Sequence, residues 1–247
     1  MIHKAHQLLA QGLAEPTTVA IDSTLIPARG PCRHKGRKRP SGDDPDAGWG
    51  KSDHHDWVYG YAVNVVVTAT PGSLVLPLMA SVHPANAFEG HALQAQAPRL
   101  PPGTRYVLAD RIYDTNACSD AVEYGPDGQR LARRFVCPLM GRAGKPTVGR
   151  HPHRGQRERH RRDRQRRQSF MRSPLGKHLY RRRSQTVEPF MEWWKAKFDL
   201  HDHVPHRGLP NNRTHLLAAM LGYLLLVECH CLRGHKNAQV QYILDEW

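Results

Sequence analysis

The sequence predicts an α/β fold in which a mixed sheet is covered by helices. Two observations predict it. Three or more β-rich runs come first in the chain, and shorter strands then alternate with helices. That order is typical of a mixed sheet with helices packed on it. A chain of 247 residues with 39% hydrophobic residues can also bury a substantial core.

The first third of the chain gives the start of this sheet. Residues 1–16 form a short helical lead-in that a proline ends, and residues 17–24, TTVAIDST, are predicted to be a strand that finishes on Asp22. Residues 29–56 are rich in glycine, proline and charge and show no periodicity, which predicts a loop.

The remaining elements follow in alternation. The apolar, β-branched runs 57–70 and 73–85 are separated by Pro-Gly and predict two hairpin-like strands. Beyond them we expect a helix at 88–100, a strand at 105–110, a helix at 115–125 and a strand at 133–140. A helix at 180–195 and a final helix at 214–234 complete the chain.

The chain is strongly basic, with a net charge of +14. Such a balance most often indicates a nucleic-acid partner and less often an anionic membrane. Residues 150–167 hold nine arginines, two acids and no lysine, which is a net charge of +7. Arginine suits bidentate phosphate contact, so we predict that the basic segment of about 141–172 binds phosphates, with Arg161 and Arg162 as candidates. A solvated basic loop is the alternative.

Two acids follow apolar strands. Asp22 closes the run Val-Ala-Ile, and Asp110 closes Tyr-Val-Leu-Ala. A carboxylate at the end of a buried strand loses hydration and needs a cation or hydrogen-bond donors. For either acid alone, a turn or a helix cap is the alternative role. Two in one sheet indicate a ligand site, because strand ends in α/β sheets lie where ligands bind.

Glu188 supplies a third carboxylate from the helix at 180–195. The core-facing positions of this helix are predicted to be Val187, Met191, Trp194 and Phe198. Glu188 borders that stripe and is expected to point into a cleft, with a surface counter-charge as the alternative. Three acids of this kind predict a Mg²⁺ site, and two such ions can activate an attacking oxygen and stabilise a leaving one in phosphodiester chemistry.

These residues resemble an insertion-sequence transposase of the DDE class, the branch with an RNase H-like catalytic domain. The resemblance runs from about residue 18 to about residue 228. AIDST and VLADRIYD resemble the strands of the first and second aspartates. Between them lie a Gly-rich lead into a Tyr-Gly-Tyr strand, GWGKSDHHDWVYGYAVNVVV, and a Pro-Ala-Asn turn before a helix, HPANAFEGHAL. The last piece, YRRRSQTVEPFMEWWK, resembles the third-acid signature.

The resemblance implies an RNase H-like domain over 17–247, with the basic segment inserted before the last catalytic helix. It implies that Asp22, Asp110 and Glu188 are catalytic and bind two Mg²⁺ ions, with Mn²⁺ as a substitute. The DNA phosphates at the end of the mobile DNA element would contact Tyr180, Lys195 and one of Arg181, Arg182 and Arg183. Arg183 is favoured, although four residues separate it from Glu188 where the signature has three, and we expect a loop before the helix to absorb the extra residue.

The implied activity is cleavage and strand transfer of a mobile element's ends in DNA, by a chain that assembles on DNA as a homodimer. Only about 16 residues precede the first strand, so we expect a truncated copy that lacks the usual N-terminal DNA-recognition domain. An RNase H-like nuclease without strand transfer and a non-catalytic nucleic-acid-binding remnant are the alternatives.

The predicted compartment is the cytoplasm of a prokaryote, in association with the nucleoid. Five cysteines are too few and too irregular for a disulfide framework, which indicates a reducing compartment. No signal peptide is visible, and the longest apolar run, 216–227, is shorter than the ~20 residues that span a bilayer. We therefore expect a soluble protein with no membrane partner.

Overall fold

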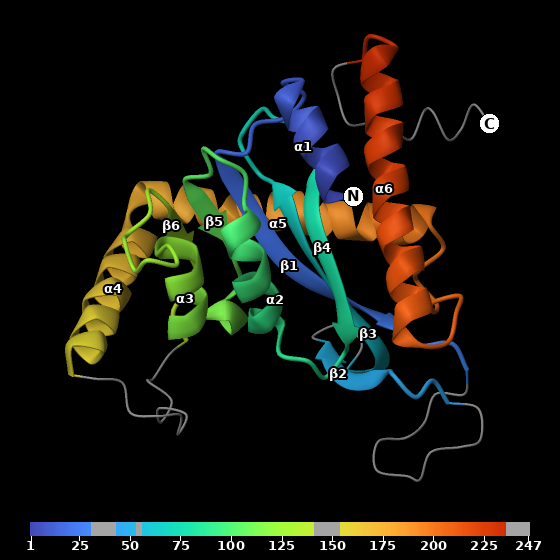
Figure 1. The fold of residues 1–247 in the computed structure, drawn as a ribbon, viewed down its shortest axis with the longest axis horizontal. Helices are drawn as coiled ribbons and strands as arrows, with labels where there is room; N and C mark the ends of the chain where they lie inside the picture. Colours follow the sequence, from blue (N-terminus) through green and yellow to red (C-terminus); the bar gives the residue numbers. More distant parts are fainter. Residues whose placement is uncertain (31–42, 53–55, 141–153, 236–247) are drawn as a thin grey trace.

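The computed structural model describes residues 1–30, 43–52, 56–140 and 154–235 of the chain. At its centre is a six-stranded sheet with the order β2-β3-β1-β5-β6, and β4 pairs with β3 beside that path (Figure 1). The strands are β1 (Thr18–Pro27), β2 (Gly48–Ser52), β3 (Asp56–Thr68), β4 (Pro77–Pro84), β5 (Tyr106–Leu108) and β6 (Arg134–Val136). The helices are α1 (Ile2–Ala10), α2 (Glu89–Gln96), α3 (Asn116–Glu123), α4 (Arg154–Arg172), α5 (Pro174–Lys197) and α6 (Leu209–Leu232), with short 3₁₀ turns η1 (Ala97–Arg99) and η2 (Arg111–Tyr113).

The sheet is mixed, as predicted. β3 pairs antiparallel with β1, β2 and β4, whereas β5 is parallel to β1 and β6 is parallel to β5. The two long runs predicted as a hairpin-like pair are the antiparallel neighbours β3 and β4. Helices cover the sheet, which confirms the α/β class and is consistent with an RNase H-like domain.

The predicted loop at 29–56 is wrong over its last part, where β2 pairs with the start of β3. The glycines that favoured a loop serve close packing instead. A Cβ on Gly48 would lie 2.3 Å from Oδ1 of Asn86, and one on Gly50 would lie 2.8 Å from the carbonyl oxygen of Ala85. Residues 31–42 and 53–55 of that predicted loop lie outside the described residues.

The prediction that the first strand finishes on Asp22 is also wrong. β1 continues to Pro27, and its pairing with β3 runs without a break past Asp22 to the pair of Pro27 with Gly60. A Cβ on Gly60 would lie 2.1 Å from the carbonyl oxygen of Ile26, so the glycine of the Tyr-Gly-Tyr stretch lets the two strands stay close. Asp22 therefore lies in the middle of a strand that pairs with β3 along almost its whole length and with β5 over Thr18–Ala20.

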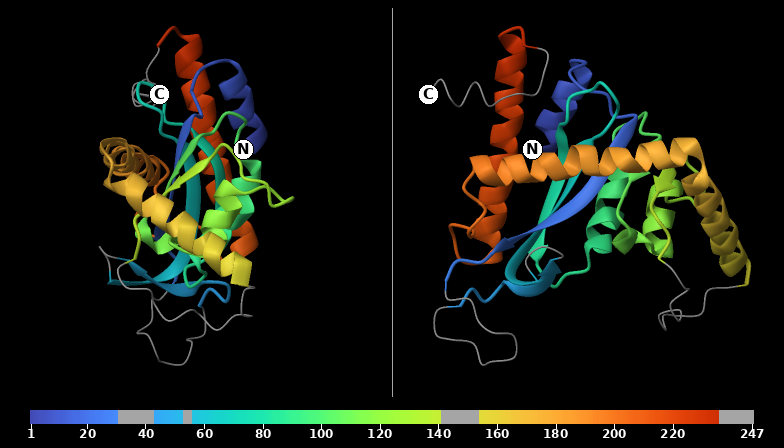
Figure 2. Two further views of the ribbon diagram at one scale, coloured as in Figure 1. Left: turned by 90° about the vertical axis from the view of Figure 1, so that its left-hand side faces the viewer. Right: turned by 180° about the vertical axis from the view of Figure 1, so that it is seen from behind.

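Helices lie on both faces of the sheet. α5 crosses one face, and α2 and α3 lie on the other (Figures 1 and 2). The predicted core stripe of α5 is largely confirmed, because Val187, Met191 and Trp194 are buried. Phe198 lies just beyond the end of α5 and is half-buried. This stripe fixes the rotation of α5, and with it the direction of Glu188.

α6 packs beside β4 and α1, at the end of the molecule opposite α4 (Figure 1). Its 24 residues are long and apolar enough to cross a membrane by length and composition alone, and 39% of its most apolar window is buried. Core helices of soluble proteins meet the same criterion, so this is weak support for a membrane span. The large apolar side chains that α6 buries are those of Leu216, Met220, Tyr223, Leu224 and Val227, and it also buries Asn212, Ala219 and His230.

Candidate active site on β1, β5 and α5

Asp22 and Asp110 lie at the same level of neighbouring strands. β1 and β5 are parallel, and Ala20 pairs with Leu108. Each aspartate lies two residues beyond that pair, in extended backbone, so the alternation of side chains directs both to the same face of the sheet. Burial raises the pKa of Asp22 to about 6, against the lowering effect of Arg183 and of the N–H of Ser23.

Glu188 is brought to Asp22 by an arginine on its own helix. Nη1 of Arg183 lies 2.5 Å from Oδ2 of Asp22, and Nη2 lies 3.0 Å from Oε1 of Glu188. Of these side chains, Arg183 is 13% exposed, Asp22 is 20% exposed and Glu188 is 51% exposed. Burial alone would lower the pKa of Arg183, but Asp22 and, to a smaller extent, Tyr180, Asp110 and Glu188 raise it, so the guanidinium stays charged.

Tyr180 connects the second aspartate to the same helix. Its hydroxyl donates to Oδ1 of Asp110 over 3.2 Å, and the guanidinium of Arg183 lies 5.9 Å from the centre of its ring. Burial raises the pKa of Tyr180, with a further rise from Asp110, so the hydroxyl keeps its proton and acts as a donor. One face of α5 thus contacts both strand aspartates.

Family comparison decides what kind of domain this is. A family model described as the transposase DDE domain matches residues 13–225, which contain all three acids. The chain belongs to that family. No curated protein and no solved structure matches the chain significantly. The match confirms the resemblance to an insertion-sequence DDE transposase, and membership in this family implies DNA as a partner.

Two of the seven residues predicted to contact DNA lie among the acids of this transposase domain, and the other five do not. Tyr180 and Arg183 lie among the acids, whereas Arg181 is exposed and Arg182 is half-buried on other faces of α5. The other three predicted residues lie elsewhere. Lys195 pairs with Glu192 at 2.5 Å, two turns beyond Glu188, and Arg161 and Arg162 are exposed on α4. The role of each in DNA binding stays a prediction.

The expected loop before the Glu188 helix is absent from the structure. Arg183 and Glu188 both lie inside α5, which begins at Pro174. The extra residue of the spacing is therefore accommodated by the length of the Arg183 side chain, which reaches Glu188 from a position five residues earlier on a continuous helix.

Sequence reasoning missed Glu89, the first residue of α2. Its charge contributes to the raised pKa of Asp22, and it also contributes to the raised pKa of Tyr113, which is raised first by burial. Glu89 is half-buried, so the transposase domain holds a fourth carboxylate near the first aspartate. The only signal was its position at the start of the helix that follows the Pro-Ala-Asn turn of the family resemblance.

The oxygen donors of the site suit a hard divalent cation. Among the described residues, no group of three His, Cys, Asp or Glu side chains is gathered closely enough to hold a metal ion. Two of the acids instead share the guanidinium of Arg183, a cation that stands between Asp22 and Glu188. Asp22 and Glu188 therefore bind positive charge in this structure, and the family generally uses divalent metals.

Proposed function

We propose that this transposase domain catalyses divalent-metal-dependent cleavage at a mobile element's ends and transfer of the freed 3′ end to target DNA. The observation that supports this most is the bridge of Arg183 between Asp22 and Glu188, with Asp110 at the same level on the next strand. Two of the three acids share one cation, and the third accepts a hydrogen bond from Tyr180 on the same helix, which supports a site that binds positive charge.

Mg²⁺ is the proposed ion, with Mn²⁺ as its substitute, and Asp22, Asp110 and Glu188 would hold two such ions. When bound, a metal pair activates the attacking oxygen and stabilises the leaving 3′ oxygen. The protein's part is to present three carboxylates from rigid elements and to orient Asp110 through the Tyr180 hydroxyl. Arg183, released from the acids, would then be placed to contact a DNA phosphate.

The proposal is tested by nicking of a supercoiled plasmid in Mg²⁺ or Mn²⁺. Wild type should nick, and Asp110→Asn should lose activity by two orders of magnitude or more, because the amide is a poor metal ligand. Asp202→Asn is the matched control, since Asp202 is exposed and lies beyond the end of α5, with no ion pair or side-chain hydrogen bond among the described residues. Equal nicking by wild type and Asp110→Asn would contradict the assignment.

Strand transfer separates a transposase from the alternative nuclease. An oligonucleotide that carries the element's end should become joined to target DNA by wild type, and cleavage without joining would favour the nuclease. Binding that depends steeply on salt but not on Mg²⁺, without cleavage, would favour a non-catalytic remnant. We also propose a homodimer on DNA, which mass photometry of the complex would detect, in a protein that acts at the nucleoid.

A further inference from the structure

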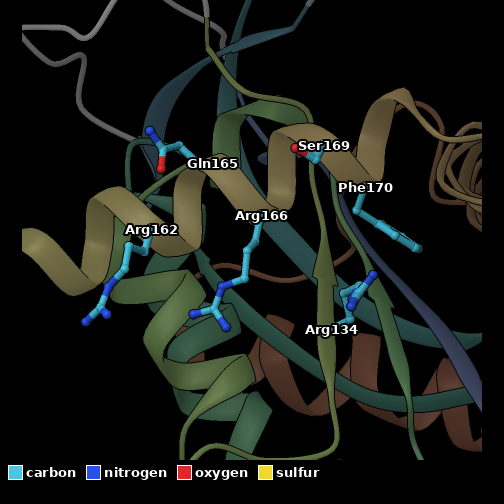
Figure 3. Close-up of a pocket in the computed structure, with 6 residues that line it drawn as sticks. All are labelled: Arg134, Arg162, Gln165, Arg166, Ser169 and Phe170. Carbon is cyan, nitrogen blue, oxygen red and sulfur yellow. The ribbon is translucent and has the colours of Figure 1, made fainter.

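A strongly basic surface, separate from the site of the three acids, lies beside α4 at the edge of the sheet. One hollow of about 710 Å³ is lined by Arg134, Arg162, Gln165, Arg166, Ser169 and Phe170 (Figure 3). An adjoining hollow of about 380 Å³ shares Arg134 and Phe170 with it and adds the side chains of Arg105, Arg130 and Arg133. We call the two hollows together the arginine groove. The guanidinium groups of Arg134, Arg162 and Arg166 extend to the same side of α4 (Figure 3).

The charged side chains that line the arginine groove all carry positive charge. Six arginines line it, and no acidic side chain lines either hollow in the part of the chain that the structure describes. Among the described residues, two of the six have a carboxylate partner, because Arg130 lies 3.6 Å from buried Glu123 and Arg166 pairs with buried Asp163. Arg133 donates to the backbone carbonyls of Ala97 and Leu100. So many like charges at close range repel each other, and a bound polyanion would offset that repulsion.

The outer arginines of α4 are not needed to hold the helix in place. Its inner face is fixed by other contacts, of which the ion pair of Arg167 with Asp114 at 2.8 Å is almost fully buried. Arg159 pairs with Asp120 at 2.7 Å, and Tyr124 donates to Asp163 over 2.8 Å. The predicted basic segment thus forms a docked helix over Arg154–Arg172, whereas its part at 141–153 lies outside the described residues.

The floor of the groove is ordered by aromatic contacts. The guanidinium of Arg134 lies 4.3 Å from the centre of the Phe170 ring, and that ring stacks on Tyr106 at 6.2 Å with an interplanar angle of 7°. Phe170 is thus already engaged by its neighbours and does not serve as a platform for an unpaired base. What the groove offers a ligand is a set of guanidinium groups, which suit phosphates.

The arginine groove is separate from the three acids. Tyr106 and Arg134 are the first residues of β5 and β6 and pair with each other, whereas Asp110 follows the other end of β5. Four residues of extended chain from Tyr106 to Asp110 span about 13 Å. A phosphate bound at the acids cannot also occupy the groove, so the groove would contact a different stretch of the DNA.

We propose that the arginine groove binds the sugar-phosphate backbone of duplex DNA outside the carboxylate site, without reading its sequence. The choice of DNA as the polymer rests on the proposed function. The polar lining side chains are arginines, a glutamine and a serine, and the rest are aliphatic side chains or aromatic rings that are already packed. The contact is therefore electrostatic and gives the same affinity for unrelated sequences. Its role is to hold the element's flank or the target while the acids act on another phosphate.

The test is fluorescence-anisotropy binding of a random-sequence duplex in EDTA, across a salt series. Arg105→Gln/Arg162→Gln removes one arginine from each hollow. Both side chains are exposed, and neither has a hydrogen-bond or ion-pair partner among the described residues. Each lost phosphate contact lowers the slope of log K against log salt by about 0.9, so the slope should fall by about 2. Two unrelated duplexes should show the same loss.

The matched control is Lys51→Gln/Arg213→Gln, which removes the same charge from exposed positions on β2 and α6. Its slope should equal that of wild type. An equal loss in both double variants would show a general effect of net charge, and an unchanged slope in the groove variant would show that no phosphate binds there. Either result overturns the proposal.

Failure of the groove and failure of the proposed function are distinguishable, because binding in EDTA does not require catalysis. If the groove variant changes the salt slope but wild type does not nick plasmid, the groove proposal is supported and the catalytic assignment is contradicted. If wild type nicks plasmid but the groove variant does not change the slope, the catalytic assignment is supported and the groove proposal is contradicted.

Discussion

Arg183→Gln removes the cation that two of the three acids share, and its effect can be worked out from the structure. Removing one partner of a buried ion pair costs about 3–5 kcal/mol, because it leaves an uncompensated charge. Asp22 is 20% exposed and Glu188 is 51% exposed, so solvent reduces this cost. We expect a loss of about 2 kcal/mol at neutral pH without metal. For a chain of this length, that corresponds to a melting temperature about 4–8 °C lower.

Divalent cations should reverse this loss. In wild type a metal ion has to compete with the guanidinium, and in the variant it does not. If the metal binds the variant about tenfold more tightly, the stabilisation by saturating metal grows by about 1.4 kcal/mol. Thermal melts in EDTA and in Mg²⁺ or Mn²⁺ measure both quantities, and Arg181→Gln, an exposed position on the same helix, should melt within about 0.5 kcal/mol of wild type.

Two results would refute this reasoning. If Arg183→Gln melts like Arg181→Gln in EDTA, the bridge to Asp22 and Glu188 contributes nothing. If the variant and wild type gain equally from metal, the ion does not bind where the guanidinium lies, and the metal-ligand assignment of those two acids fails.

Two further predictions concern acids of the same domain. Because burial raises the pKa of Asp22 to about 6, its stabilising contribution is complete below pH 3.8 and is lost as pH rises towards 6. The difference in the free energy of urea unfolding between wild type and Asp22→Asn, measured in EDTA, should therefore change by about 2 kcal/mol between pH 4 and pH 7, and a constant difference would contradict the raised pKa. Arg167→Gln should lower the free energy of unfolding by about 3 kcal/mol, because Asp114 is only 1% exposed and keeps a weaker partner. Arg161→Gln, exposed on the same helix, should stay within about 0.5 kcal/mol of wild type, and equal losses in the two variants would contradict the docking of α4.

The sequence predicted most of the fold because the signals were local. The β-branched runs of β3 and β4 have a strand period, and the stripe of Val187, Met191 and Trp194 has a helix period. β2 was missed because its glycines usually indicate turns, and only the neighbouring Ala85 and Asn86 show why glycine is needed. Such a close approach depends on tertiary contacts that no sequence window contains.

The site was predicted in part. The three acids were found from their places after strands and on a helix, but their assignment as metal ligands stays a prediction. The bridge through Arg183 could not be foreseen, because it depends on the rotation of α5 over β1. Glu89 was missed because an acid at a helix start is usually a simple helix-terminus charge.

α5 has a consequence for how this domain tolerates change in length. A Cβ on Gly176 would lie 2.0 Å from the carbonyl oxygen of Phe170, so the start of α5 packs against the end of α4 with no room for a side chain. From that start, α5 runs about 36 Å, close to one turn of B-form DNA. A single residue inserted between Leu175 and Glu188 would swing the acid by about 100° around the helix axis. Natural variants should therefore vary in length mainly at the loops around this helix, and a change of count inside it requires a side chain that still reaches the acid, as Arg183 does from five residues before Glu188.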